Sequence, residues 1–199
     1  MPVPNLIVVA GPPAVGKSSF SRFVSARMGY PILEKDAYKE ILFDDVGFQS
    51  REEKVKLGVA AMDLMYAEAA RLLELGISVI LDNNFENGSL PGLEKLVREH
   101  PCNAVTVRFT ADPAVVYQRF VARDMDPARH RGHVLNTRYP ESGEREEYVP
   151  IGPEAFEKKF RQRGVFDFAF GEKVITADLT DIDAFDPAAL MEELGRVLV

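Results

Sequence analysis

The sequence predicts an α/β fold built on a parallel sheet. Apolar runs of strand length alternate with longer segments of helical periodicity, and these segments are long enough for crossover helices. A glycine-rich motif also stands between the first apolar run and the first helical segment, as expected where a strand turns into a helix around a ligand. The expected strands cover residues 6–10, 31–34, 77–81, 104–109 and 173–176.

Helix ends are indicated by capping residues. Gly29 and Gly76 are placed to close the first and second long helices, and Asp112 is placed to cap another helix ahead of Pro113. The expected helices cover residues 17–28, 55–75, 113 to about 121, 153–163 and 187–199.

Length and composition favour one enzyme domain spanning residues 1–199. The chain has 46% hydrophobic and 28% charged residues, which are ordinary values for a globular protein. Its formal charge of -7 provides no general attraction for polyanions, so a nucleic-acid substrate would need a local basic patch. We find no signal segment and no apolar run long enough to cross a bilayer, so we expect a cytoplasmic protein with no membrane partner.

A phosphate-binding loop is the strongest motif. Residues 11–18 fit the pattern G-x-x-x-x-G-K-[ST] directly after an apolar strand. Its glycines allow backbone N–H groups to approach phosphates, Lys17 is expected to reach the β- and γ-phosphates, and Ser18 is expected to hold Mg²⁺. An ordinary glycine-rich turn is the alternative. The expected nucleotide-binding residues are Gly11, Pro12, Pro13, Ala14, Val15, Gly16, Lys17, Ser18 and Ser19.

Asp36 follows the second expected strand. Because ligands of open parallel sheets bind beyond the carboxyl ends of the strands, Asp36 is expected near the phosphate-binding loop. There its carboxylate could accept the proton of an attacking hydroxyl and orient it. Aspartate is also a preferred helix cap, so Asp36 could cap the following helix, and the two roles can coexist.

Asp82 ends the third expected strand and is followed by Asn83 and Asn84. An apolar strand that ends in aspartate is typical of an acid that holds Mg²⁺ directly or through water. Asp and Asn also favour turns, so a turn without a metal role is the alternative. We expect Asp82 to contact the metal shell or the acceptor.

A polar segment at residues 122–153 is rich in Arg, His, Pro, Gly and Glu. Arg119 and Arg123 lie four residues apart on one helix face, and the sequence Arg-His-Arg-Gly-His follows at residues 129–133. Guanidinium groups match the charge of a transferred phosphoryl group, and a mobile lid can deliver them while excluding water. The alternative is a solvated face on which these arginines pair with Asp124 and Asp126.

Together these features resemble the P-loop kinases that include polynucleotide 5′-hydroxyl kinases, chloramphenicol phosphotransferase and zeta-toxin kinases, and most of all bacterial kinases of the AAA-type ATPase group. The resemblance spans residues 6–133. It implies a P-loop NTPase three-layer sandwich with strand order 2-3-1-4-5, ATP on the loop, Mg²⁺ on Ser18 and an acceptor-activating Asp36. It also implies catalytic lid arginines at Arg119 and Arg123, of which Arg119 fits better.

Two departures bear on the acceptor. Polynucleotide kinases commonly carry arginine where this chain has Lys39, and another arginine soon after the Asp-Asn strand end, where residues 85–90 contain none. With the acidic net charge, this favours an ATP-dependent kinase for a small-molecule hydroxyl, with Lys17, Asp36, Arg119 and Arg123 as catalytic residues. A polynucleotide 5′-hydroxyl kinase and a nucleotide-dependent switch remain the alternatives. The oligomeric state is left open.

Overall fold

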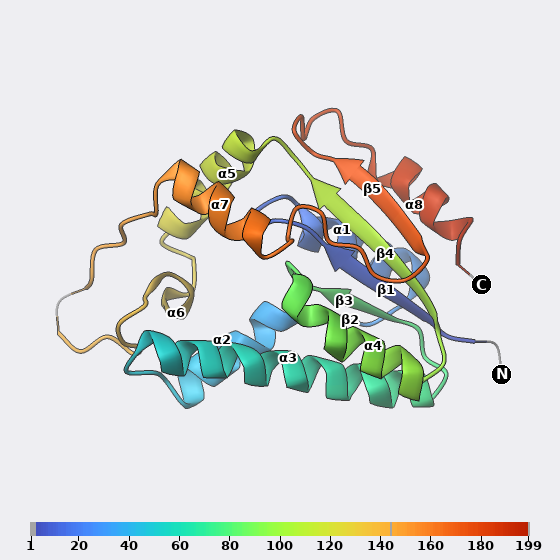
Figure 1. Ribbon diagram of the computed structural model, residues 1–199, viewed down its shortest axis with the longest axis horizontal. Coiled ribbons are helices and arrows are strands. Elements are labelled where there is room, and N and C mark those ends of the chain that lie inside the picture. The colour runs from blue at the N-terminus through green and yellow to red at the C-terminus, as the bar shows by residue number, and fades with distance from the viewer. Residues whose placement is uncertain (1–2, 144, 199) are drawn as a thin grey trace.

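The computed structural model describes residues 3–143 and 145–198 and contains a five-stranded sheet. Neighbouring strands all pair in parallel, in the spatial order β2-β3-β1-β4-β5 (Figure 1). The predicted fold class and strand order are confirmed. The strands are β1 (Asn5–Ala10), β2 (Ile32–Glu34), β3 (Val79–Asp82), β4 (Asn103–Thr110) and β5 (Lys173–Asp178).

Helices cover both faces of the sheet (Figure 1). They are α1 (Lys17–Met28), α2 (Lys35–Asp45), α3 (Arg51–Glu74), α4 (Leu90–Glu99), α5 (Pro113–Met125), α6 (Arg131–Val134), α7 (Pro153–Gln162) and α8 (Pro187–Gly195), with a 3-10 turn at Asn87–Ser89.

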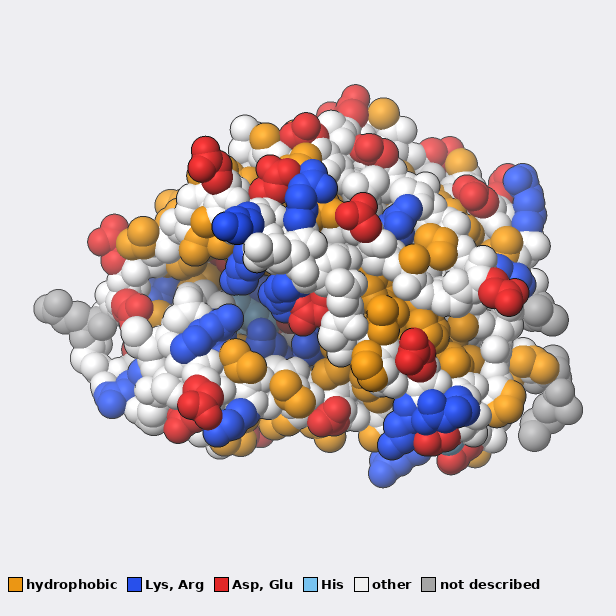
Figure 2. All heavy atoms as spheres, viewed as in Figure 1, with side chains coloured by type: hydrophobic (Ala, Val, Ile, Leu, Met, Phe, Trp, Pro, Cys, Tyr) orange, Lys and Arg blue, Asp and Glu red, His pale blue; other side chains and the backbone are white. Residues whose placement is uncertain are grey.

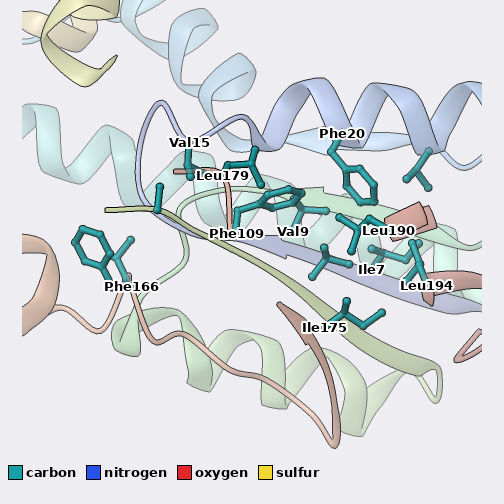
Figure 3. Packing of buried hydrophobic residues seen from close by; sticks show 14 of the residues in the cluster. Ile7, Val9, Val15, Phe20, Phe109, Phe166, Ile175, Leu179, Leu190 and Leu194 are labelled. Atoms are coloured by element: carbon teal, nitrogen blue, oxygen red, sulfur yellow. The ribbon is translucent and has the colours of Figure 1, made fainter. Parts of the chain in front are cut away.

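Alternation along β1 divides the core into two layers. Ile7 and Val9 pack in a cluster with residues of α1 and α8, such as Phe20 and Leu190 (Figure 3). Leu6 and Val8 point to the opposite face, where they join residues of α3 and α4. Since successive strand side chains point to opposite faces, a continuous apolar run such as β1 is buried on both sides.

The connections after β1 and β3 leave a crevice between these neighbouring strands. The chain leaves β1 into α1 on one face of the sheet and leaves β3 toward α4 on the other face. Where two such connections diverge, the carboxyl ends of the strands are open to a ligand. The phosphate-binding loop and Asp82 both lie at this point.

Local capping explains where the structure departs from the expected helix bounds. The helix expected at 55–75 begins earlier, at Arg51, because Ser50 Oγ accepts a hydrogen bond from Glu53 N at 3.2 Å. The Glu53 carboxylate accepts one from Gln49 N at 2.6 Å, which ties the residue before the cap to the first turn. The last helix ends at Gly195, and residue 199 lies outside the described part of the chain. A helix after Asp36 was expected without bounds and corresponds to α2, whereas α4 and the short α6 were not predicted.

The polar segment after α5 is anchored to the body of the protein. Val134 and Leu135 pack with Phe43 and Phe48 in a third apolar cluster. Phe48 and Tyr139 exchange two backbone hydrogen bonds of 2.7 and 2.8 Å. In Figure 1 this segment lies beside one end of α2 and α3. Phe43 and Phe48 are therefore core residues, and residues 122–125 belong to α5.

Within residues 3–143 and 145–198, none of the helices combines the length and the apolar character needed to cross a bilayer.

Candidate functional site

The loop between β1 and α1 has the backbone of an anion-binding turn. Ala14 has φ 60° and Gly16 has φ 115°, so left-handed residues alternate with others along the loop. Gly11 has φ 136°, and a Cβ there would lie 2.3 Å from the carbonyl oxygen of Phe109. Glycine is therefore required at position 11 by both conformation and space. The first turn of α1 receives no side-chain cap, which leaves its N–H groups to the loop cavity.

Lys17 lies at the centre of this loop and is buried. Its Nζ donates to the carbonyl oxygens of Gly11 and Pro12, at 3.0 and 2.7 Å, and to Asn84 Oδ1 at 2.9 Å. Burial lowers the pKa of Lys17 to about 8, while the Asp82 carboxylate acts in the opposite direction. The sequence did not indicate that Asn84 holds the lysine. The one sequence feature that could have indicated this contact is the position of Asn84, two residues after the strand-end Asp82.

Asp82 is a buried carboxylate surrounded by hydroxyl groups. Ser21 Oγ donates to its Oδ2 at 3.0 Å, and Ser18 also donates to it. Burial raises the pKa of Asp82, while the Lys17 ammonium and the two serine hydrogen bonds act to lower it. A serine hydroxyl beside a carboxylate is the kind of hard oxygen pair that Mg²⁺ prefers. The structure thus brings together the two residues predicted to serve the metal.

Asp36 lies in the first turn of α2, two residues after Glu34, the last residue of β2. The cap position belongs to Glu34, and Asp36 makes no side-chain capping bond, so the capping alternative for Asp36 is not supported. Arg129 Nη2 lies 3.5 Å from its Oδ2. Desolvation acts to raise the pKa of Asp36, but His133, Lys39 and Arg129 outweigh it and lower the pKa to about 2. Its carboxylate is therefore ionised at neutral pH.

The two predicted arginines of α5 differ in their contacts. Arg119 donates to the carbonyl oxygens of Leu179 at 2.6 Å and Thr180 at 3.2 Å, in the loop after β5. Arg123 donates to Asp124 Oδ1 through Nε at 3.0 Å and Nη2 at 2.8 Å. The guanidinium of Arg119 is thus occupied by backbone, whereas Arg123 belongs to an acid-base cluster with Asp124 and Arg129.

Two adjacent cavities lie along this edge of the sheet. The first, of about 360 Å³, is lined by residues 14–19 of the loop together with Asp82, Arg119 and Arg123. The second, of about 640 Å³, extends between α3 and α7. Asp36 lines both cavities. So do Asn83, Asn84 and Arg123.

Most predicted site residues line the first cavity. Of the loop residues, Gly11 and Pro12 line neither cavity, and Pro13 lines the second one. Several basic side chains that the sequence did not single out line the second cavity. They are Lys35, Arg51, Lys54, Lys159 and Arg163.

The first cavity fits a nucleoside triphosphate with Mg²⁺. Its alternating left-handed backbone and the uncapped start of α1 suit phosphate oxygens. The Nζ of Lys17 is held by loop carbonyls and Asn84 at the same place. Ser18 and Asp82 are the residues that would hold the metal ion.

Comparisons with known proteins agree with this site. The AAA domain family matches residues 6–137, which include the loop, Asp36 and Asp82. A search of curated proteins finds no match to the sequence. A crystal structure of a candidate kinase from Chloroflexus aurantiacus is 28% identical, with a TM-score of 0.82 over 100% of both chains.

More distant structures share the fold alone. A gluconokinase from Sinorhizobium meliloti is 18% identical, with a TM-score of 0.54 over 97% of this chain and 90% of that one. A tunicamycin resistance protein from Deinococcus radiodurans is 14% identical, with a TM-score of 0.59 over 98% of this chain and 97% of that one. The chain therefore belongs to the AAA domain family, and it has the P-loop NTPase fold of the P-loop kinase group.

Proposed function

We propose that this protein is an ATP-dependent kinase that transfers the γ-phosphate of MgATP to a hydroxyl group of a small molecule. The observation that carries the proposal is the position of Asp36, which lines both the loop cavity and the larger cavity beside it. A nucleotide-hydrolysing switch needs one cavity, whereas a transferase needs a second cavity for the acceptor. A carboxylate at their junction can orient a hydroxyl group and accept its proton.

Other residues take roles that follow from their contacts. The Lys17 ammonium is placed to exchange its loop carbonyls for phosphate oxygens. Arg123 lines both cavities and is therefore placed to neutralise charge on the group in transit. Arg119 holds the loop after β5 against the loop cavity. Mg²⁺, held through Ser18 and Asp82, would neutralise phosphate charge when bound.

The low pKa of Asp36 shapes its role. A carboxylate with a pKa of about 2 is a weak base, so its main contribution is to accept a hydrogen bond from the acceptor hydroxyl and fix its direction. Phosphates bound nearby would raise its pKa, because like charges disfavour ionisation. Proton acceptance then becomes easier when nucleotide is present.

The segment that carries Arg129 and α6 is proposed as the lid. Arg129 reaches Asp36 from this segment, and Lys54 and Arg51 of α3 hold it through His133, Leu135 and Asn136. A lid held over the acceptor side would exclude water, which otherwise competes with the acceptor hydroxyl.

The experiment is ADP release from MgATP against a panel of nucleosides, sugars, sugar acids, phenicol and aminoglycoside antibiotics, and 5′-hydroxyl oligonucleotides. Lys17→Ala serves as the blank. The proposal expects stimulation by one class of small hydroxyl compound, with a phosphorylated product detected by mass spectrometry. Stimulation by oligonucleotides alone would replace it with a polynucleotide kinase. Tight ATP binding with no stimulation by any acceptor would contradict the kinase assignment.

A further inference from the structure

The larger cavity is strongly basic in a protein that is acidic overall. Its lining contains eight Lys or Arg side chains and four Asp or Glu side chains, although the chain carries a formal charge of -7. Figure 2 shows Lys and Arg side chains gathered around a hollow, in the region where Figure 1 places α7 above α3. Since the remainder of the chain is more acidic than the whole, this concentration of positive charge belongs to the cavity.

Five of these eight cations have no carboxylate partner within 4 Å among the described residues; one of them, Lys54, donates to backbone carbonyl oxygens instead. Among the described residues, no acidic oxygen lies within 4 Å of the charged groups of Lys35, Lys39, Arg51 or Lys159. By contrast, Arg163 is paired with Glu86. Ordinary surface cations gain little from pairing, but cations crowded into one cavity repel one another.

The cations that line the cavity come from separate helices: Lys39 from α2, Arg51 from α3 and Lys159 from α7. Burial lowers the pKa of Lys39 to about 8, and Arg51 contributes to that lowering from α3. Burial also lowers the pKa of Lys159 of α7, again with a contribution from Arg51. Three helices thus direct positive charge at a common space that borders Asp36. An anion in that space would relieve the repulsion, and a neutral molecule would not.

We propose, resting on the kinase function above, that the acceptor is a small hydroxyl compound that carries an anionic group, phosphate or carboxylate, held between Arg51, Lys159 and Lys39. The anionic group would anchor one end of the acceptor, while its hydroxyl would reach Asp36. Arg51 provides a planar fork suited to either group, and the lysines add point charges.

A polynucleotide fits this charge distribution less well. Nucleic-acid affinity comes from neutralising many backbone phosphates along an extended path. Here the positive charge is gathered in one cavity of about 640 Å³, and the chain as a whole carries a formal charge of -7. One anionic group of a small molecule matches such a cavity, whereas a long polyanion would meet repulsion beyond it.

The test measures anion binding separately from turnover. Protein saturated with Mg²⁺ and the non-hydrolysable analogue AMP-PNP, which occupies the loop cavity, is titrated with inorganic phosphate and with acetate in a calorimeter. We expect saturable binding of at least one anion, weakened by about tenfold or more in Arg51→Ala and in Lys159→Ala. Lys158→Ala is the matched control, because it removes a lysine next to Lys159 that does not line the cavity. Whether phosphate or acetate binds more tightly identifies the group.

Turnover then separates this proposal from the kinase function. Hydroxyl compounds are compared with their phosphorylated or carboxylated counterparts, such as glycerol with glycerol 3-phosphate and glycerate. The proposal expects a higher kcat/KM for the anionic member and a KM raised about tenfold in Arg51→Ala.

Phosphorylation of neutral acceptors with a KM unchanged in Arg51→Ala would overturn the anionic acceptor and leave the kinase function intact. Absence of saturable anion binding, equal binding in all variants, or binding of oligonucleotides alone would also overturn it. Anion binding without transfer to any hydroxyl compound would support the anion site and contradict the kinase function.

Discussion

Lys54 offers a stringent test of how the lid is held. Its side chain is 4% exposed, and its Nζ donates to the carbonyl oxygen of His133 at 2.6 Å and to that of Leu135. Lys54→Met keeps the apolar stem but removes both donations. Each buried carbonyl left without a donor costs about 1–3 kcal/mol, and because the segment can open to water we expect a total of roughly 2–4 kcal/mol.

The assay is urea unfolding followed by circular dichroism, with a thermal scan alongside. For a chain of this size the expected loss corresponds to a fall in Tm of about 5–15 °C. Lys56→Met is the matched control, because Lys56 lies on the same helix and its ion pair with Glu52, at 2.9 Å, is exposed to solvent. Such a pair is worth less than about 1 kcal/mol.

A Lys54→Met free energy of unfolding within about 0.5 kcal/mol of the Lys56→Met value would contradict this role of Lys54, since surface substitutions fall in that range. It would mean that water replaces the Lys54 ammonium as the donor to both carbonyl oxygens with no loss of stability. Trypsin cleavage after Arg138 supplies a second readout, because a released segment should be cut faster in Lys54→Met than in the control.

Three further outcomes follow from the site. Gly11→Ala should lower the free energy of unfolding in a urea titration by more than about 3 kcal/mol, because it combines backbone strain with a Cβ 2.3 Å from a backbone oxygen. The control Gly143→Ala, at φ 101° with nothing within 4 Å of the new Cβ, should lose only the part due to strain. In an NMR titration the Asp36 carboxylate should have a pKa well below its ordinary value of 3.8. The stability that this carboxylate contributes is then fully present above its unfolded pKa and is lost as the pH falls through about 2. A midpoint near 4 would show that the neighbouring cations do not lower the pKa of Asp36. Asp82→Asn should raise the Mg²⁺ concentration for half-maximal nucleotide binding by about 10–100-fold, and an unchanged Mg²⁺ dependence would remove Asp82 from the metal shell.

Features encoded locally could be predicted from the sequence. The segments β1, the loop and α1 are contiguous in the chain. The apolar run predicts the strand, the glycine positions predict the loop, and Gly29 predicts the end of the helix. The strand order was predicted only from the resemblance to P-loop kinases. No local sequence pattern indicates that β3 pairs with both β2 and β1. Asp36 and Asp82 were predictable because parallel strands end at the same edge of the sheet.

The basic cavity could not be predicted in the same way. Arg51, Lys54 and Lys159 stand in amphipathic helices where charged residues usually face water, and nothing local distinguishes them from Lys56 or Lys158. They meet only because α3 and α7, far apart in the chain, lie on either side of one space. For the same reason no local pattern indicated that the polar segment after α5 is anchored, whereas the carbonyl oxygens of His133 and Leu135 accept hydrogen bonds from the buried Lys54.

The proposed role of Asp36 in directing the acceptor hydroxyl is tested by comparing Asp36→Asn with the wild-type protein once an acceptor has been found. Nucleotide affinity and phosphoryl-transfer rate are measured on the same preparation, with Asp45→Asn of the same helix as the control. We expect unchanged MgATP affinity and a transfer rate lower by about 100-fold or more. Transfer at the wild-type rate by an Asp36→Asn variant that binds MgATP normally would contradict this role.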